Sequence, residues 1–147
     1  MSDTESHNGW RQPALLLSAD EHDRLLGLAQ ADSSRHPLVQ GHRLLDELDR
    51  ADIVPHSWMP PGIVRMDSHI EYHDDGVGRV RQVQLVYPDR ADISMGRISV
   101  LSPVGTALIG LAAGQSITWA TRSGRPRRLT VMRVGDKPFA EVPSGPA

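Results

Sequence analysis

The segment from residue 98 to residue 111 decides the fold, and it reads ISVLSPVGTALIGL. Ile98 and Val100 have the period-two spacing of a short strand. Ser102 then precedes Pro103, and a serine followed by a proline at the first helical position is a typical helix start. Gly110 is suited to ending that helix, because glycine adopts the left-handed conformation without steric cost. The segment therefore predicts a strand that leads directly into a short helix.

Four further strands are predicted on both sides of this unit. They are marked by alternating apolar residues, which are Ile70 and Tyr72, then Val83, Leu85 and Tyr87, then Ile117 and Trp119, and last Leu129 and Val131. Asp74-Asp75-Gly76 and Ser123-Gly124 are turn signals between neighbouring strands. Residues 53–138 are therefore expected to form an antiparallel sheet domain with one packed helix at 103–109.

Residues 14–52 have helical periodicity instead. Ser18 and Glu21 have the spacing of a capping box, which predicts a helix from about residue 19 to residue 31. A second apolar stripe runs to about Arg50, and the short connection makes the two helices antiparallel. The tip of this hairpin is predicted at Asp32, Ser33, Ser34 and Arg35, and the seam at Leu25, Leu28, Leu38, Leu45 and Leu48.

The fold class that follows is α+β, with a short N-terminal antiparallel helical hairpin (a coiled coil) in front of the sheet domain. The polar segment 1–13 and the Pro/Gly-rich end at 139–147 are expected to be flexible tails.

Composition excludes several classes of protein. The chain has no cysteine, so it has no disulfide framework, thiolate nucleophile or zinc–thiolate site. Its start lacks the features of a secretory signal, and no stretch approaches the roughly 20 apolar residues that span a bilayer. We therefore expect a cytoplasmic protein with no membrane partner.

The charges are distributed unevenly. Residues 1–52 hold ten acids and five arginines, a net charge of −5, whereas residues 53–147 hold eight acids and eleven bases, a net charge of +3. This balance is too mild for a protein that binds nucleic acid mainly by neutralising phosphates. A protein partner fits better.

Three motifs give the chain a family resemblance. LVYP at 85–88, the segment at 98–111 and GQSI at 114–117 resemble the C-terminal domain of the Gre transcription elongation factors. With LDRA at 48–51 and MDS at 66–68, the chain is identified as a member of the Rnk family, the regulators of nucleoside diphosphate kinase. The resemblance implies an FKBP-like domain that docks on bacterial RNA polymerase at the rim of the secondary channel. It also implies that the hairpin points into that channel. The protein is then expected to be a monomer and to associate with DNA only through the polymerase.

The family docking motif falls on Ser102 and Pro103, and the resemblance implies a partner-binding set completed by Leu101 and Thr106. Gre factors usually carry Asp or Asn where this chain has Leu101, which predicts weaker or differently oriented docking. Ser102 acting only as a helix cap is the alternative.

The chemistry of transcript cleavage is not expected here. Gre factors use two neighbouring carboxylates at the tip of a long coiled coil to help hold a metal ion, because a divalent cation needs several anionic oxygens. The predicted tip offers only Asp32, interpreted as an exposed turn residue that ends the first helix. Each helix of about 13 residues spans only ~20 Å. The sequence therefore predicts a regulator that is not an enzyme, has no catalytic residues and competes with Gre factors without cleaving RNA.

Other sites are weakly indicated. His69 and His73 lie four residues apart on one strand, about 13 Å, too far to share an ion, so neither a metal nor a cofactor is expected. The basic run of Arg122, Arg125, Arg127 and Arg128 is interpreted as a solvated hairpin end, with an acidic protein surface or RNA as alternative partners. Two rival functions remain: direct binding to nucleoside diphosphate kinase, and peptidyl-prolyl isomerase activity suggested by the fold alone.

Overall fold

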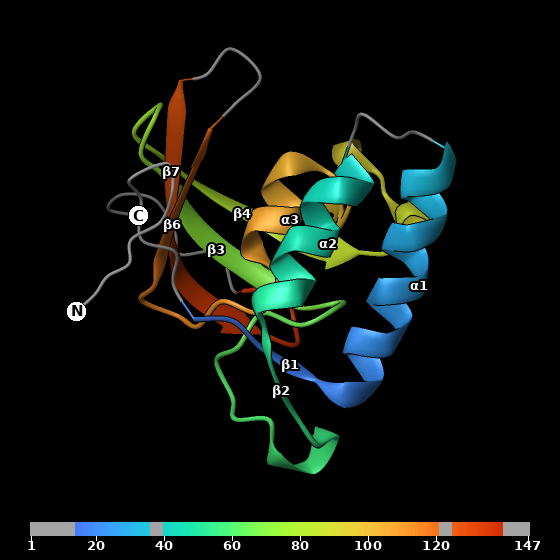
Figure 1. The fold of residues 1–147 in the computed structure, drawn as a ribbon. Helices are drawn as coiled ribbons and strands as arrows, with labels where there is room; N and C mark the ends of the chain where they lie inside the picture. Colours follow the sequence, from blue (N-terminus) through green and yellow to red (C-terminus); the bar gives the residue numbers. More distant parts are fainter. Residues whose placement is uncertain (1–13, 36–39, 121–124, 140–147) are drawn as a thin grey trace, which may run out of the picture.

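A twisted sheet carries one short helix on its inner face, and a pair of longer helices packs on the far side of that short helix (Figure 1). The computed structural model describes residues 14–35, 40–120 and 125–139. The sheet has five strands in the order β5-β4-β3-β7-β6. They are β3 (His69–Asp74), β4 (Arg79–Val86), β5 (Arg97–Ser99), β6 (Ser116–Ala120) and β7 (Pro126–Gly135). All five predicted strands are therefore present in an α+β fold.

The prediction of an entirely antiparallel sheet is wrong at β5. This strand pairs with β4 in parallel, through Gln84 with Arg97, Leu85 with Ile98 and Val86 with Ser99. The connection at 87–96 contains the 3-10 turns η2 (Pro88–Arg90) and η3 (Ile93–Met95). These turns carry the chain back beside Gln84, so β5 runs along the last three residues of β4 and in the same direction.

A second, two-stranded parallel sheet occupies segments predicted as hairpin and loop. β1 (Leu16–Ser18) pairs with β2 (Asp52–Val54). β1 also bonds to the main sheet domain, because Leu16 N donates to Gly110 O at 3.0 Å. The segment predicted as the hairpin region, 14–52, therefore begins with a strand, and its first helix starts at Ala19, close to the predicted residue 19. Leu15 and Leu17 alternate as strand residues, and both are buried.

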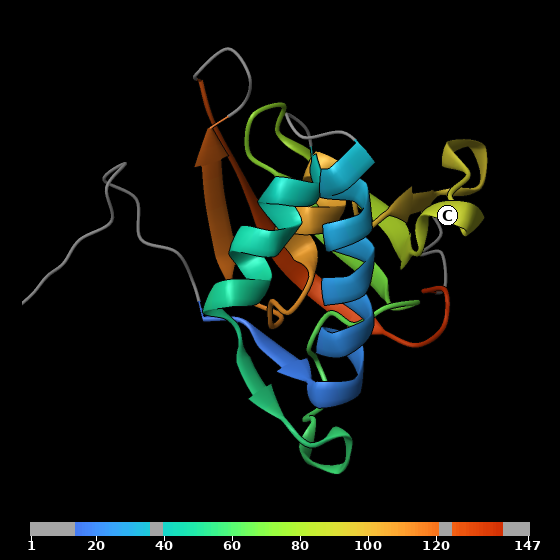
Figure 2. The same ribbon diagram turned by 45° about the vertical axis from the view of Figure 1, so that its right-hand side comes forward.

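The two helices of the hairpin are confirmed. α1 (Ala19–Arg35) and α2 (Gln40–Arg50) run antiparallel and lie side by side, as Figure 2 shows. Glu21 N donates to Ser18 Oγ at 3.2 Å, which is the predicted cap. Leu25 and Leu48 are buried in the seam and Leu28 and Leu45 are partly buried. Leu44, which was not among the predicted seam residues, is fully buried, and Leu38 lies outside the described residues.

The predicted tip needs a correction. Asp32, Ser33, Ser34 and Arg35 belong to the last turn of α1, so the interpretation of Asp32 as a turn residue that ends the helix is wrong. Polar side chains do not stop a helix when no breaker follows, and Ser34 Oγ donates to Gln30 O at 3.1 Å within the helical register. The first breaker in the sequence is Pro37, which disfavours helical geometry in the residue before it.

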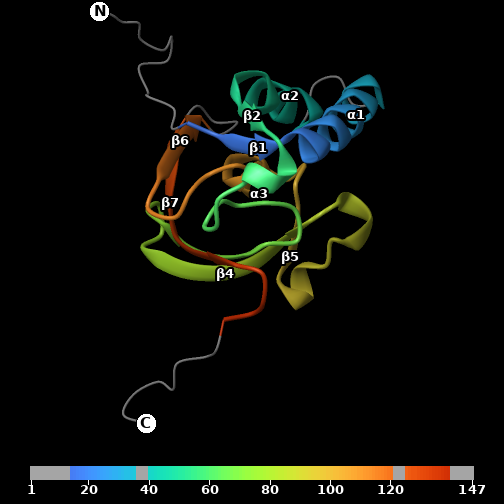
Figure 3. The same cartoon turned by 90° about the horizontal axis from the view of Figure 1, so that it is seen from below.

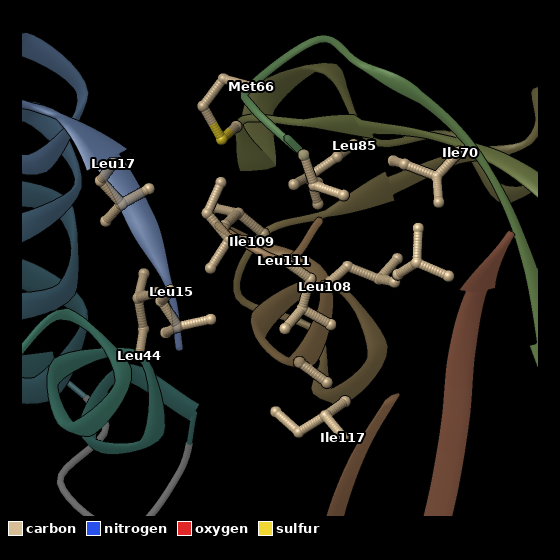
Figure 4. Close-up of a cluster of buried hydrophobic side chains, with 14 of the residues drawn as sticks. Leu15, Leu17, Leu44, Met66, Ile70, Leu85, Leu108, Ile109, Leu111 and Ile117 are labelled. Atoms are coloured by element: carbon tan, nitrogen blue, oxygen red, sulfur yellow. The ribbon is translucent and has the colours of Figure 1, made fainter. Parts of the chain in front are cut away.

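One hydrophobic core joins the hairpin to the sheet. The helix α3 (Pro103–Leu108) lies between α2 and the inner face of the sheet, which curves around it in Figure 3. Leu15, Leu17 and Leu44 face Leu108 and Ile109 in Figure 4, and all five belong to a single buried cluster. The hairpin is therefore packed along the domain. No helix in the described part of the chain is both long and apolar enough to cross a membrane.

Candidate functional site

The start of α3 is built around the Ser102 hydroxyl. Ser102 Oγ accepts a hydrogen bond from Gly105 N at 3.0 Å and donates to Ser99 O at 2.7 Å. Pro103 occupies the first turn, where its missing N–H costs nothing, and it is exposed. The predicted cap is thus confirmed. It fixes an exposed proline and a half-buried serine at the end of β5.

The neighbours of Ser102 differ in access to solvent. Leu101 is half-buried, and its amide donates to Ser99 Oγ at 3.0 Å. Thr106 is only 1% exposed, and its hydroxyl donates to Val100 O at 2.6 Å. Thr106 therefore supports the turn from inside, and the surface available to a partner is made by Leu101, Ser102 and Pro103.

Gly105 allows this turn to close. A Cβ placed on Gly105 would lie 2.0 Å from Ser99 O, closer than any real contact. The absence of a side chain lets α3 start directly against the end of β5. This close approach holds the partly exposed Leu101–Pro103 segment in one position.

The other end of β5 presents two exposed apolar side chains that sequence reasoning missed. Ile93 is 86% exposed and Met95 is 64% exposed, both in η3. The loop is closed by reciprocal backbone bonds between Asp92 and Arg97, with N–O distances of 2.9 and 3.0 Å. Asp92 also accepts from Ser94 N at 3.1 Å and from Ser94 Oγ at 2.6 Å. The bonds from Ser94 hold the pKa of Asp92 below its ordinary value.

We call Ile93, Met95, Leu101, Ser102 and Pro103 the β5 edge surface. Its first two residues lie before β5 and its last three lie after β5, so the strand joins the two parts. The sequence signal that could have predicted this loop is Asp92 followed four residues later by Gly96. Gly96 has a positive φ of 74°, a conformation that suits glycine and closes the turn on which Ile93 and Met95 lie.

The predicted hairpin-tip residues do not form a metal site. Asp32 and Ser33 are half-buried and Ser34 is exposed on the last turn of α1. In the described ranges, no three His, Asp or Glu side chains come together as a ligand group. The last turn of α1, as far as the structure describes it, therefore carries one carboxylate, that of Asp32.

Two of the predicted basic residues are engaged by aspartates. Arg127 Nη2 lies 2.7 Å from Asp74 Oδ2, and Arg128 Nε lies 3.5 Å from Asp75 Oδ2. Arg125 is exposed, and Arg122 lies outside the described residues. His73 also bonds Asp75, at 2.5 Å, on the outer face that it shares with His69.

Comparisons with known proteins agree with this architecture. The family model for the C-terminal domain of the transcription elongation factors GreA and GreB matches residues 59–136. A regulator of nucleoside diphosphate kinase from Escherichia coli strain K12 is 38% identical over 94 residues, which are 64% of this chain and 69% of that protein. A transcription elongation factor GreA from Thermodesulfovibrio yellowstonii is 35% identical over 114 residues, 73% of this chain and 72% of that protein.

A solved structure is also similar. The elongation factor GreA/GreB from Nitrosomonas europaea superposes with a TM-score of 0.63 at 31% identity, and the match covers 84% of this chain and 99% of that one. The family model spans the sheet and α3, and the structural match extends to the hairpin. The chain therefore belongs to the GreA/GreB C-terminal domain family, together with the regulators of nucleoside diphosphate kinase.

Proposed function

We propose that the protein is a non-catalytic transcription regulator that binds RNA polymerase at the rim of the secondary channel. It competes there with Gre factors and does not stimulate transcript cleavage. The observation that carries this proposal is the partly exposed segment Leu101–Pro103, which the Ser102 cap holds at the start of α3 within the matched domain. The family resemblance implies a docking motif at this segment. In this proposal the protein acts in the cytoplasm as a monomer. It associates with DNA only through the polymerase.

The β5 edge surface has the composition of a docking site. Its side chains are mostly apolar, and backbone bonds hold both halves of the surface before any partner arrives. Preorganised apolar groups bind well because little conformational entropy is lost on association. Leu101, where Gre factors usually carry Asp or Asn, makes the contact apolar rather than polar.

The hairpin supports a role without cleavage. α1 has 17 residues, a length of ~25 Å, and its last turn carries the single carboxylate of Asp32. The hairpin lies along α3 and the core instead of projecting freely. A short hairpin of this kind can obstruct the secondary channel or exclude a competing factor. It cannot supply the pair of carboxylates that would help to bind a metal ion in the polymerase active centre.

The test is a binding assay with core RNA polymerase. Leu101→Arg with Pro103→Arg places two unpaired charges in the apolar surface and should weaken binding by at least a hundredfold. Trp58→Arg with Met132→Arg is the matched control, because both positions are exposed apolar residues outside the β5 edge surface. Wild-type affinity in the folded Leu101/Pro103 variant would refute docking through this surface.

The name of the Escherichia coli relative favours a second candidate, direct binding to nucleoside diphosphate kinase. Pull-downs with purified kinase and with purified core polymerase separate the two candidates. Capture of the kinase alone would replace the first proposal. Capture of polymerase alone would support it.

A further inference from the structure

The edge of the main sheet at β4 is only partly covered. β5 pairs with Gln84, Leu85 and Val86, whereas β4 begins at Arg79. From Arg79 to Gln82 the strand pairs with β3 on one side, and no described strand pairs with its other side. All four residues are exposed. We call this segment the open β4 edge.

The open β4 edge has backbone N–H and C=O groups that can form hydrogen bonds with an added strand. Gln84 N donates to Gly96 O at 2.8 Å and Val86 O accepts from Val100 N at 2.9 Å, so the even-numbered residues of β4 point away from β3. Backbone groups of alternate strand residues point to the same side. The N–H and C=O groups of Val80 and Gln82 therefore face outward, and no described backbone group bonds them there.

The two faces of the open β4 edge differ in charge. Arg79 and Arg81 lie on the inner face, opposite Asp74 and Tyr72 in register, and neither forms an ion pair within the described part of the chain. The carboxylate nearest in register, Asp74, is held by Arg127 at 2.7 Å. The Cα atoms of Arg79 and Arg81 are ~7 Å apart along the strand. Two neighbouring guanidinium groups are thus left to attract an anionic partner.

The outer face of the same edge is mainly uncharged. Val80 is 50% exposed there. Farther along β4, a depression of about 200 Å³ is lined by Gln82, Gln84, Met95 and Phe139. Glu71, the acid on this face, is occupied by Arg133 at 2.9 Å and Gln82 at 3.0 Å. A segment added here would meet cations on one side and apolar groups on the other.

Nucleic acid fits this edge less well than a peptide does. Phosphate oxygens accept hydrogen bonds but donate none, so a phosphate backbone would leave the outward carbonyls of Val80 and Gln82 without partners. An extended peptide supplies donors and acceptors alternately. Its side chains also alternate between the two faces, as those of the open β4 edge do. A second copy of this chain would bring arginines against arginines, since charged edge residues oppose self-pairing.

We propose that the open β4 edge is a strand-addition site for an extended acidic segment of a partner protein. Carboxylates at alternate positions of that segment pair with Arg79 and Arg81, while the residues between them pack on Val80 and toward Met95. Backbone bonds to Val80 and Gln82 supply affinity, and the two arginines select the sequence. This site includes Met95 of the β5 edge surface but none of the Leu101–Pro103 segment, whose variants test polymerase docking.

The probe is a blocked peptide of sequence Thr-Glu-Val-Glu-Val-Glu-Thr, whose glutamates and valines lie on opposite faces when it is extended. Titration calorimetry should show saturable binding to the wild-type protein. Arg79→Gln with Arg81→Gln should weaken that binding at least tenfold. Lys137→Gln, an exposed cation outside this edge, is the control and should change binding less than threefold.

A second arm separates strand pairing from simple charge attraction. Val80→Pro removes one outward N–H, keeps both arginines, and should weaken binding at least tenfold, whereas Val80→Thr keeps the N–H and should bind nearly as wild type. If Val80→Pro does not fold, the wild-type protein is titrated with the same peptide N-methylated at alternate residues. Loss of binding on methylation supports strand addition.

Three outcomes would overturn the proposal. They are no binding of the peptide at millimolar concentration, unchanged binding of the N-methylated peptides in both alternating registers, and displacement of the peptide by an equal concentration of a twelve-nucleotide RNA. The first rejects the site, the second leaves only charge attraction, and the third identifies nucleic acid as the occupant. None of them bears on polymerase docking, which is measured with the Leu101 and Pro103 variants.

Discussion

Asp74 and Arg127 form an ion pair, 2.7 Å between Oδ2 and Nη2, that joins the end of β3 to the start of β7 across 53 residues of sequence. The Asp74 side chain is 2% exposed. Burial alone would raise the pKa of Asp74, but the Arg127 guanidinium and the amides of Gly76 and Val77 outweigh it and hold that pKa below its ordinary value. The pair secures the turn from which the open β4 edge begins.

Asp74→Asn should lower the free energy of unfolding by about 1–3 kcal/mol at pH 7, because a buried acceptor loses its charge-assisted bond. Since the folded-state pKa is depressed, the stabilisation is fully present above the unfolded-state pKa of ~3.9 and is lost as pH falls through the folded-state value. Denaturant unfolding at several pH values measures this loss. The difference between wild type and variant should shrink below pH 4.

Asp46→Asn, at an exposed position of α2, is the matched control and should change stability by less than about 0.5 kcal/mol. A wild-type advantage over Asp74→Asn that stays constant down to pH 2 would contradict the assignment.

Gly105→Ala should destabilise the protein by about 3 kcal/mol or more, because the new Cβ meets Ser99 O at 2.0 Å and a backbone segment must move. Gly27→Ala is the control: Gly27 is exposed within α1, and its added Cβ meets no atom within 4 Å. That change should stabilise the protein by about 0.5–1 kcal/mol through helix propensity. Thermal unfolding should show shifts of opposite sign, and equal shifts would rule out this close approach.

Leu44→Ala should cost about 2–5 kcal/mol, because Leu44 is fully buried between the hairpin and the domain. Leu45→Ala should lower the free energy of unfolding clearly less, since Leu45 is only partly buried. The pair of variants tests the register of α2 by chemical denaturation. A larger loss for Leu45 would mean that α2 is rotated about its axis relative to this structure.

Backtracked elongation complexes incubated with the protein and magnesium should release short 3′ RNA fragments no faster than complexes without it, because α1 ends with one carboxylate, Asp32. A Gre factor added to the same reaction should become less active as the protein competes for the channel. Asp32→Ala should leave this competition unchanged. Accelerated cleavage by the protein alone would reverse the proposed role.

Local patterns predicted the elements better than their arrangement. Alternation at Ile70 and Tyr72 and the cap at Ser102 were sufficient, because both depend on neighbours a few residues away. The parallel direction of β5 depends on how the 87–96 connection turns, and alternation carries no information about direction. β1 and β2 were missed because the run Leu15–Leu17 shows no alternation and because the two strands pair with each other across the whole hairpin.

In the candidate site, too, local motifs were predictable from the sequence, whereas features that depend on the three-dimensional arrangement were not. The motif identified Leu101, Ser102 and Pro103, but it also included Thr106, whose hydroxyl is directed to Val100 O inside the fold. The exposure of Ile93 depends on the closed Asp92–Arg97 loop. Likewise, Asp74 and Arg127 are brought together only by the sheet register, which no local spacing reveals.

The short strand β1 has a consequence for cooperativity. Leu16 N bonds to Gly110 O at 3.0 Å, and Asp52 N bonds to Leu15 O at 2.9 Å, so the segments entering and leaving the hairpin are both fastened at its base. Rotation of the hairpin as a rigid arm would break these bonds and expose Leu15 and Leu17 to water. Hairpin and sheet should therefore unfold together in one transition, and the Leu16 amide should exchange its hydrogen only through that global event.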